Sequence, residues 1–130
     1  MAIEGLEADN INIAASYNNR GVLHFGMGAY AEALSDFEQA IQLDARMAEA
    51  HVNKGYTLIA LKRWNESIPA FDRGIALGAP EEAKVHFNRG IAYEESGNLR
   101  MAYQDYLMAS QLDPLWEAPK LELRRFIVPE

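Results

Sequence analysis

Histidine and acidic side chains are the groups of this chain that could catalyse a reaction or hold a metal. The three histidines are His24, His51 and His86, and the last two lie 35 residues apart. Zinc sites combine histidines and carboxylates at shorter, characteristic spacings, which this chain does not show. Glu94 and Glu95 are adjacent, so on a helix they point about 100° apart and make a poor acid–base pair. We therefore expect structural histidines, no metal, no cofactor and no catalytic site.

A row of amides recurs at fixed positions along the chain. An asparagine lies two residues before each of three regularly spaced glycines. An amide carries both donors and acceptors, so a row of amides can hydrogen-bond the backbone of an extended segment. One such asparagine would favour mere tolerance on an exposed helix, but three out of three favour a binding role. The asparagines are Asn19, Asn53 and Asn88.

A basic residue immediately precedes each of the same glycines. In two of the three cases an aspartate follows sixteen residues later, which joins Arg20 to Asp36 and Arg89 to Asp105. Where the base is Lys54, that later position holds an alanine. The pattern favours an ion pair between two packed helices over ligand binding.

These positions belong to a pattern that the chain repeats three times. The anchoring glycines are Gly21, Gly55 and Gly90, so the spacings are 34 and then 35 residues. After each glycine come a small residue, an aromatic residue, a second small residue and a leucine, always at the same distances. A fixed period of this length is typical of helical repeat proteins. The aromatic residues are Phe37, Phe71 and Tyr106, and the small residues are Ala33, Ala40, Ser67, Gly74, Ala102 and Ala109.

Each repeating unit is expected to fold as two packed helices. Small residues let the helix backbones approach, and the aromatic residue fills the space beside them. The extra residue between the second and third units falls in the loop 78–80, where an insertion costs little. The breaks between the two helices of each unit are predicted at Gly28, at 62–64 and at 97–98.

The period, the order of glycine, alanine, aromatic and alanine, and the closing Asp-Pro resemble the tetratricopeptide repeat (TPR) over residues 14–116. Ala45 departs from the pattern, because it stands where a closing proline is expected. The resemblance implies an all-α fold: a right-handed superhelical stack of three helix-turn-helix hairpins with a C-terminal capping helix. The predicted segments of this single domain are a mobile N-terminal segment (1–8), three repeats (14–47, 48–82 and 83–116) and a capping helix (117–128).

The two ends of the stack have different sequences. A capping helix must cover the last apolar face and present a polar one to water. We expect Leu121 and Phe126 to pack on the third unit, while Arg124 and Arg125 stay in solvent. At the other end, Asp9 or Asn10 is predicted to cap an early start of the first helix.

One face of the first helix in each unit is not covered by its hairpin partner. At about 100° per residue, this face carries apolar residues and one asparagine per unit. In TPR proteins the corresponding stripe lines a concave groove, so the resemblance implies that it binds an extended or helical protein segment. The predicted groove residues are Asn18, Asn19, Val22, Phe25, Asn53, Tyr56, Ile59, Lys84, Phe87, Asn88 and Ile91.

Some TPR proteins bind the acidic C-terminal tails of the major heat-shock chaperones with a carboxylate clamp. That clamp uses Lys and Asn in the first unit, Asn in the second, and Lys and Arg in the third. This chain has Asn18 and Val22, then Asn53, then Lys84 and Asn88 at those positions. Only Lys84 supplies positive charge, so this mode of binding is not expected.

The overall composition narrows the class of partner. Nineteen acidic against 12 basic residues give a net charge of −7, which disfavours nucleic acid and anionic lipid. No apolar run approaches the roughly 18 residues of a membrane span, so no integral membrane insertion is expected. The acidic start lacks the features of a signal peptide, which favours a cytoplasmic protein. A targeting segment already removed would leave the same sequence.

The sequence thus predicts a non-enzymatic protein-interaction module, an adaptor or scaffold whose partner is a protein or peptide segment. One alternative is a homo-oligomer, a self-associating structural subunit whose groove takes a neighbour's terminus. Another is a chaperone for a secreted or assembly subunit. A third is an enzyme with unrecognised metal chemistry.

Overall fold

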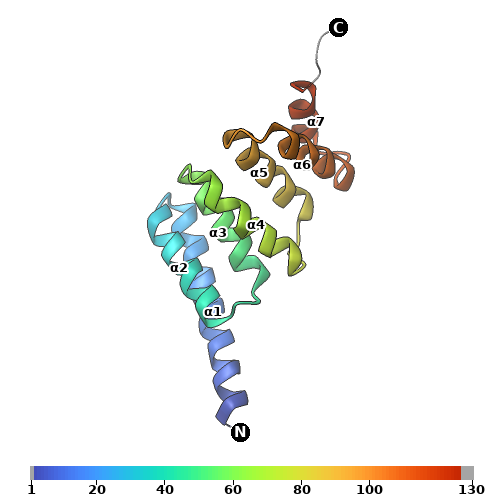
Figure 1. The fold of residues 1–130 in the computed structure, drawn as a ribbon. Coiled ribbons are helices and arrows are strands. Elements are labelled where there is room, and N and C mark those ends of the chain that lie inside the picture. The colour runs from blue at the N-terminus through green and yellow to red at the C-terminus, as the bar shows by residue number, and fades with distance from the viewer. Residues whose placement is uncertain (1, 127–130) are drawn as a thin grey trace.

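The structure of the 130-residue chain is a computed structural model that describes residues 2–126, with side chains from residue 5 onward. All regular structure in these residues is helical, and consecutive helices pair into three hairpins, α1–α2, α3–α4 and α5–α6 (Figure 1). Helix α7 packs on α6. The predicted all-α stack with a C-terminal helix is therefore confirmed. The helices are α1 (Ala2–Gly26), α2 (Tyr30–Leu43), α3 (Ala48–Ala60), α4 (Trp64–Ala76), α5 (Glu82–Glu95), α6 (Leu99–Leu112) and α7 (Glu117–Arg124).

The turns inside the hairpins lie where the sequence predicted them. Gly28 and Gly97 adopt left-handed backbone conformations, with φ values of 77° and 88°. Lys62 holds the equivalent place in the middle hairpin with φ of 59°, which is unusual for a residue with a side chain. The same turn geometry therefore recurs in all three hairpins, although the middle one lacks glycine.

The anchoring glycines are required by the close packing of the two helices in each hairpin. A Cβ atom added at Gly21 would lie 2.6 Å from the ring of Phe37, and one added at Gly55 would lie 2.5 Å from the ring of Phe71. Real Cβ atoms do not come this close to other heavy atoms. The anchoring glycine and the aromatic residue recur together because they pack directly against each other.

Helix α1 differs from the sequence prediction. It runs for 25 residues, whereas α3 has 13, and it projects beyond α2 toward the N-terminus (Figure 1). The segment 1–8, predicted to be mobile, is helical from Ala2 on, and Met1 lies outside the described residues. The prediction that Asp9 or Asn10 caps the helix is wrong, because both lie well inside it.

Helix α7 covers the end of the third hairpin. Pro119 is fully buried, and the ring of Phe126 lies 5.7 Å from that of Tyr103 and 6.0 Å from that of Tyr106. The expected packing of Leu121 is wrong, since this residue is 53% exposed. The helix ends at Arg124, earlier than predicted, and residues 127 and 128 of the predicted cap lie outside the described residues.

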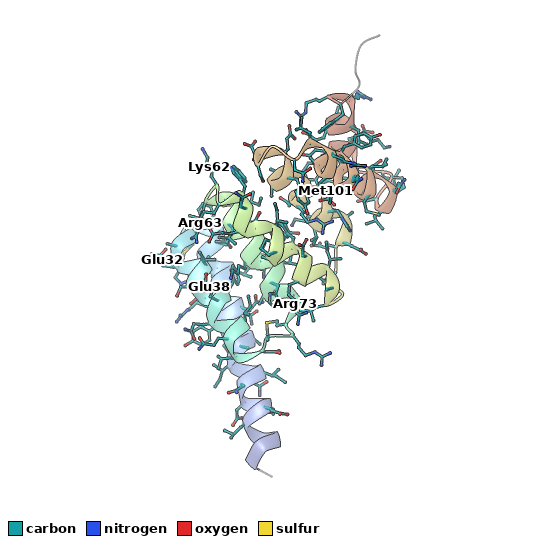
Figure 2. All side chains as sticks on the ribbon, in the orientation of Figure 1. Glu32, Glu38, Lys62, Arg63, Arg73 and Met101 are labelled. Atoms are coloured by element: carbon teal, nitrogen blue, oxygen red, sulfur yellow. The ribbon has the colours of Figure 1, made fainter. Side chains whose placement is uncertain are left out.

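The hairpins are held to one another by small apolar contacts. Ala14, Ala40 and Ala50 form one buried cluster at the first junction, and Val52 and Val85 belong to another at the second. Within residues 2–126, no helix is both long and apolar enough to cross a membrane. Charged side chains such as Glu32, Glu38 and Arg73 project from the second helices into solvent (Figure 2).

Candidate functional site

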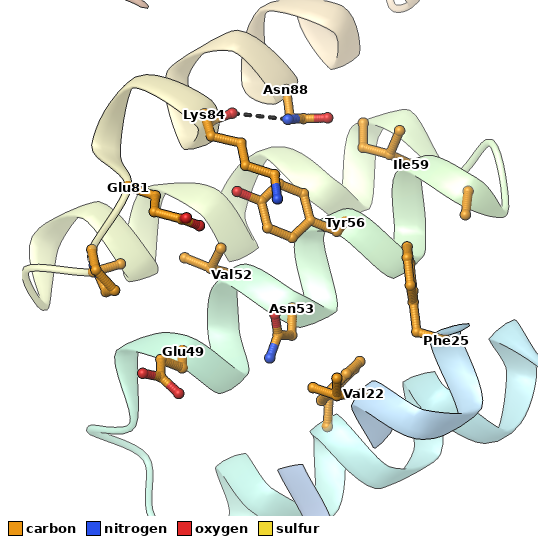
Figure 3. Close-up of a pocket in the computed structure, with 14 residues that line it drawn as sticks. Val22, Phe25, Glu49, Val52, Asn53, Tyr56, Ile59, Glu81, Lys84 and Asn88 are labelled. Carbon is orange, nitrogen blue, oxygen red and sulfur yellow. Dashed lines mark hydrogen bonds between the residues drawn. The ribbon is translucent and has the colours of Figure 1, made fainter. Parts of the chain in front are cut away.

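The first helices of the hairpins, α1, α3 and α5, line a groove with a volume of about 530 Å³ (Figure 3). Its walls are mostly apolar, and side chains from all three helices point into it. Seven of the eleven residues that the sequence predicted for the groove line this cavity. They are Val22, Phe25, Asn53, Tyr56, Ile59, Lys84 and Asn88.

Two predicted groove residues of α5 lie outside the cavity lining. The ring of Phe87 packs 5.5 Å from that of Tyr106 and 4.8 Å from that of Trp116, so it joins the third hairpin to the start of the cap. Ile91 is half-buried and does not line the cavity. The cavity is therefore formed mainly by α1, α3 and the start of α5.

The three asparagines that lie two residues before the anchoring glycines differ in their hydrogen bonds. The Asn53 side chain donates to the Oδ1 atom of Asn18, 3.1 Å away, and Asn18 is buried beside the cavity. The Asn88 side chain donates to the backbone oxygen of Lys84 at 2.8 Å, within its own helix. Asn19 is exposed and lies outside the cavity lining. Of the three, Asn53 alone links two hairpins, and its amide keeps unused hydrogen-bonding capacity toward the cavity.

Tyr56 stands at the centre of the cavity (Figure 3). Its ring packs edge-on against Phe71, with centroids 5.3 Å apart, and the Lys84 Nζ lies 5.1 Å from its ring centroid. The Tyr56 hydroxyl is buried and has no hydrogen-bond partner among the described residues. Burial, followed by the charge of Glu81, raises the pKa of Tyr56, so the hydroxyl stays protonated and can donate. Because the hydroxyl has almost no exposed surface, the part of Tyr56 that a ligand can contact is its ring.

Three charged residues lie among the cavity-lining residues. Glu49 and Glu81 are acidic, and Lys84 is the one basic residue of the lining. The cavity thus carries more negative than positive charge. This balance disfavours a strongly acidic ligand.

One wall of the cavity was missed by the sequence analysis. Ala79, Pro80 and Glu81 line it from the loop between α4 and α5, and Glu49 lines it from the first turn of α3. Glu81 has a left-handed backbone with φ of 55°, and it precedes α5 directly. The signal in the sequence was the 35-residue spacing, because the extra residue of that spacing enlarges this loop.

The predicted ion pairs are confirmed, and they lie outside the cavity lining. The Nε and Nη2 atoms of Arg20 donate to Asp36 at 2.9 and 2.7 Å, and those of Arg89 donate to Asp105 at the same distances. The third nitrogen of Arg89, Nη1, also binds Asp72 of the preceding hairpin at 2.8 Å. These pairs position the helices that carry the groove.

Two other polar side chains, His86 and Glu94, interact with neighbouring side chains of the fold. The His86 Nδ1 atom lies 3.1 Å from Asp105, inside the ion-pair cluster, and no described group of residues is arranged to hold a metal. Glu94 is held by residues of the cap and of α6. Its carboxylate accepts hydrogen bonds from Arg125 at 2.6 and 2.8 Å and from the Tyr106 hydroxyl at 2.8 Å.

Known proteins share this architecture. The first TPR of Spaghetti (RPAP3), bound to the HSP90 peptide SRMEEVD, superposes with a TM-score of 0.83 at 23% identity, covering 88% of this chain and 90% of that one. The Arabidopsis OM64 TPR domain gives 0.85 at 19% identity, covering 89% and 95%. The second TPR domain of human RPAP3, in complex with the HSP70 peptide SGPTIEEVD, gives 0.82 at 24% identity, covering 89% and 96%.

At these identities the similarity establishes the fold, and the family follows from the sequence profiles. Profiles of the tetratricopeptide repeat match residues 14–46 and residues 57–114, which together make up more than half of the chain. The first stretch holds the contact of Gly21 with Phe37, and the second holds the equivalent contact of Gly90 with Tyr106. The chain therefore belongs to the tetratricopeptide-repeat family.

Proposed function

We propose that this chain is a protein-interaction module, an adaptor or scaffold that binds a segment of a partner protein in the groove of α1, α3 and α5. The observation that carries the proposal is the mostly apolar cavity itself, which side chains of all three first helices line, with the Tyr56 ring at its centre. Apolar walls with a few well-placed polar groups are typical of ligand sites.

The lining indicates the chemistry of the segment. Val22, Phe25 and Ile59 offer apolar contacts to its side chains, and burial of apolar surface supplies most of the affinity. The Tyr56 ring adds a further apolar contact, and the Asn53 amide pairs with a peptide group of the segment. An extended chain offers such groups at regular intervals.

The charge of the groove separates this proposal from binding of acidic tails. The peptides held by the two similar RPAP3 domains both end in Glu-Glu-Val-Asp. Here Lys84 is accompanied by Glu49 and Glu81, so the lining does not concentrate positive charge. We expect a mainly apolar segment with at most one anionic group, placed at Lys84, and no requirement for a free C-terminus.

The expected affinity is modest, in the micromolar range, because a flexible segment loses conformational freedom when it is ordered. A library of peptides displayed on phage supplies a defined probe. Selected peptides would be synthesised and their affinities measured by isothermal titration calorimetry. We expect the selected sequences to be apolar and to bind equally well with amidated C-termini.

Variants of the groove test the contacts one at a time. Tyr56→Ala removes the ring that lines the cavity and should weaken binding by more than about 1 kcal/mol, and Asn53→Ala should weaken it by about 1–3 kcal/mol. The control is Leu115→Ala, a truncation at a residue that is 93% exposed and lies outside the cavity lining. Equal affinity of all three folded variants for the selected peptides would place binding elsewhere on the molecule.

A further inference from the structure

The outward face of α1, on the side away from α3, is an uncovered packing surface. Leu23 of α1 is equivalent to Thr57 of α3 and Ala92 of α5, counting from the anchoring glycines. Thr57 and Ala92 are 0% exposed, because α3 packs on α2 and α5 packs on α4, the second helix of the preceding hairpin. Leu23 is larger than either and is 67% exposed. The first hairpin therefore presents a helix-packing face with no helix on it.

This face continues along the whole described length of α1. Its residues alternate at spacings of three and four, the pattern that keeps a single stripe facing a partner helix in a coiled coil. The stripe contains large apolar residues at both ends, one small residue, one acid and one base. All of its members are exposed. They are Leu6, Asp9, Ile13, Ser16, Arg20 and Leu23, here called the α1 stripe.

We propose that the α1 stripe is a dimer interface, on which the α1 helix of a second copy lies antiparallel. One register matches every member of the stripe with a complementary member of the other copy. In it the apolar ends meet, the large Ile13 meets the small residue, and the acid meets the base. The matched pairs are Leu6 with Leu23, Ile13 with Ser16, and Asp9 with Arg20, each formed twice.

The third hairpin contains an internal precedent for the charged pair. Arg89 binds Asp105 of its own hairpin through Nε and Nη2, and it binds Asp72 of the preceding hairpin through Nη1. Arg20 binds Asp36 through the same two nitrogens, and its side chain remains 60% exposed, against 17% for Arg89. In the proposed dimer, Asp9 of the second copy takes the place that Asp72 takes beside Arg89.

The length of α1 fits this arrangement. At 1.5 Å per residue, its 25 residues span about 37 Å, and α1 projects beyond the hairpin (Figure 1), with residues 5–13 all exposed. In the antiparallel register the midpoint falls beside Ala14, where the hairpin begins. The projecting part of each copy then covers the open end of the other copy's hairpin. Consecutive helices joined by short loops also run antiparallel, so the second copy replaces a preceding helix in its usual direction.

Charge and chain path favour this arrangement over two others. A parallel pair would oppose Asp9 to Asp9 and Arg20 to Arg20, which is unfavourable. A preceding hairpin in register would be joined to α1 by a turn just before Ala14, as turns precede Ala48 and Glu82. The chain instead passes through that position as continuous helix.

Sedimentation velocity of the full chain across a concentration series is the first experiment. A shift from monomer to dimer is expected, and a monomer at every concentration up to the millimolar range would overturn the proposal. Asp9→Lys should raise the dimer dissociation constant at least about tenfold, since it opposes two like charges. The control Glu7→Lys makes the same charge change on the same helix, outside the stripe, and should leave the constant unchanged. Equal effects of the two variants would also overturn it.

Cysteine cross-linking then tests the register, because the chain has no cysteine of its own. A mixture of the Leu6→Cys and Leu23→Cys proteins should give a disulfide-linked heterodimer under mild oxidation. Each variant alone should remain uncross-linked, since in the antiparallel register like residues lie about 25 Å apart. Cross-linking of each variant with itself at the same rate would show a different pairing and reject the proposed one.

Discussion

The two ends of the helical stack differ in whether their apolar end faces are covered. At the C-terminal end, α7 buries Pro119 and brings Phe126 against the aromatic rings of α6, while Arg125 fastens the cap to Glu94. At the N-terminal end, α1 leaves Leu23 exposed and projects past its own hairpin. A repeat buries its apolar faces only against neighbouring repeats, so the first and last repeats each have one face that no other repeat covers. One end is completed within the chain, and the other is open to a second molecule.

The largest expected effect on stability comes from removing the C-terminal capping helix α7. Deletion of residues 117–130 exposes the apolar face of α6, including the ring of Tyr106. Loss of the contacts of Pro119 and Phe126, together with the exposure of α6, should cost about 3 kcal/mol or more and lower the melting temperature by roughly 10 °C or more. Thermal unfolding followed by circular dichroism measures this. An unchanged melting temperature would mean that the two ends are equally open.

Removing the arginine of an ion pair should have an intermediate effect on stability, and the loss should differ between the first and the third hairpin. Arg89→Ala removes one partner of a largely buried network that also ties two hairpins together, so it should destabilise the fold by about 3 kcal/mol. Arg20→Ala removes a more exposed arginine with contacts inside one hairpin only, and its effect should be clearly smaller. Urea unfolding of both variants at low protein concentration makes the comparison. Equal losses would show that the link to Asp72 adds nothing.

The regular part of the fold was predictable because each contact recurs in the sequence. The glycine and aromatic of each hairpin are one steric contact, and the sixteen-residue spacing of Arg20 and Asp36 reflects the helical hairpin itself. Such local, repeated relations need no knowledge of the rest of the molecule. They also placed seven groove residues on the lining of the cavity, since helical periodicity determines which side each residue occupies.

The remaining features depend on contacts that occur only once. Glu81 reaches the cavity because of one extra loop residue, and its unusual backbone conformation has no counterpart in the other junction. Leu121 was expected to pack but is exposed, because the orientation of a short helix is determined by the shape of the surface beneath it. The length of α1 was missed for a similar reason: the repeat pattern begins at residue 14 and carries no information about the helix before it.

The smallest expected effect concerns the polar contact that fastens the cap. The Arg125 guanidinium holds the pKa of Glu94 below its ordinary value near 4.5, and the Tyr106 hydroxyl acts in the same direction. Because the pKa is lowered in the folded protein, the stabilisation is fully present above pH 4.5 and is lost as the pH falls through the folded-state pKa. Glu94→Gln should therefore lower the stability at pH 7, by less than about 1 kcal/mol for so exposed a pair.

As the pH falls through the folded-state pKa, the melting temperatures of the wild type and Glu94→Gln should converge, because the wild-type carboxylate becomes protonated and its contact with Arg125 is weakened. The neighbouring exposed residue supplies the control: Glu95→Gln removes the same charge without touching the cap and should match the wild type throughout. Melting curves of the three proteins, measured from pH 7 down into the acid range, give the result. A difference between wild type and Glu94→Gln that stays constant over this range would show that packing of Phe126 and Pro119 alone holds the cap. The C-terminal end would then rely on apolar contact only, whereas the proposed pairing at the N-terminal end adds the contact of Asp9 with Arg20.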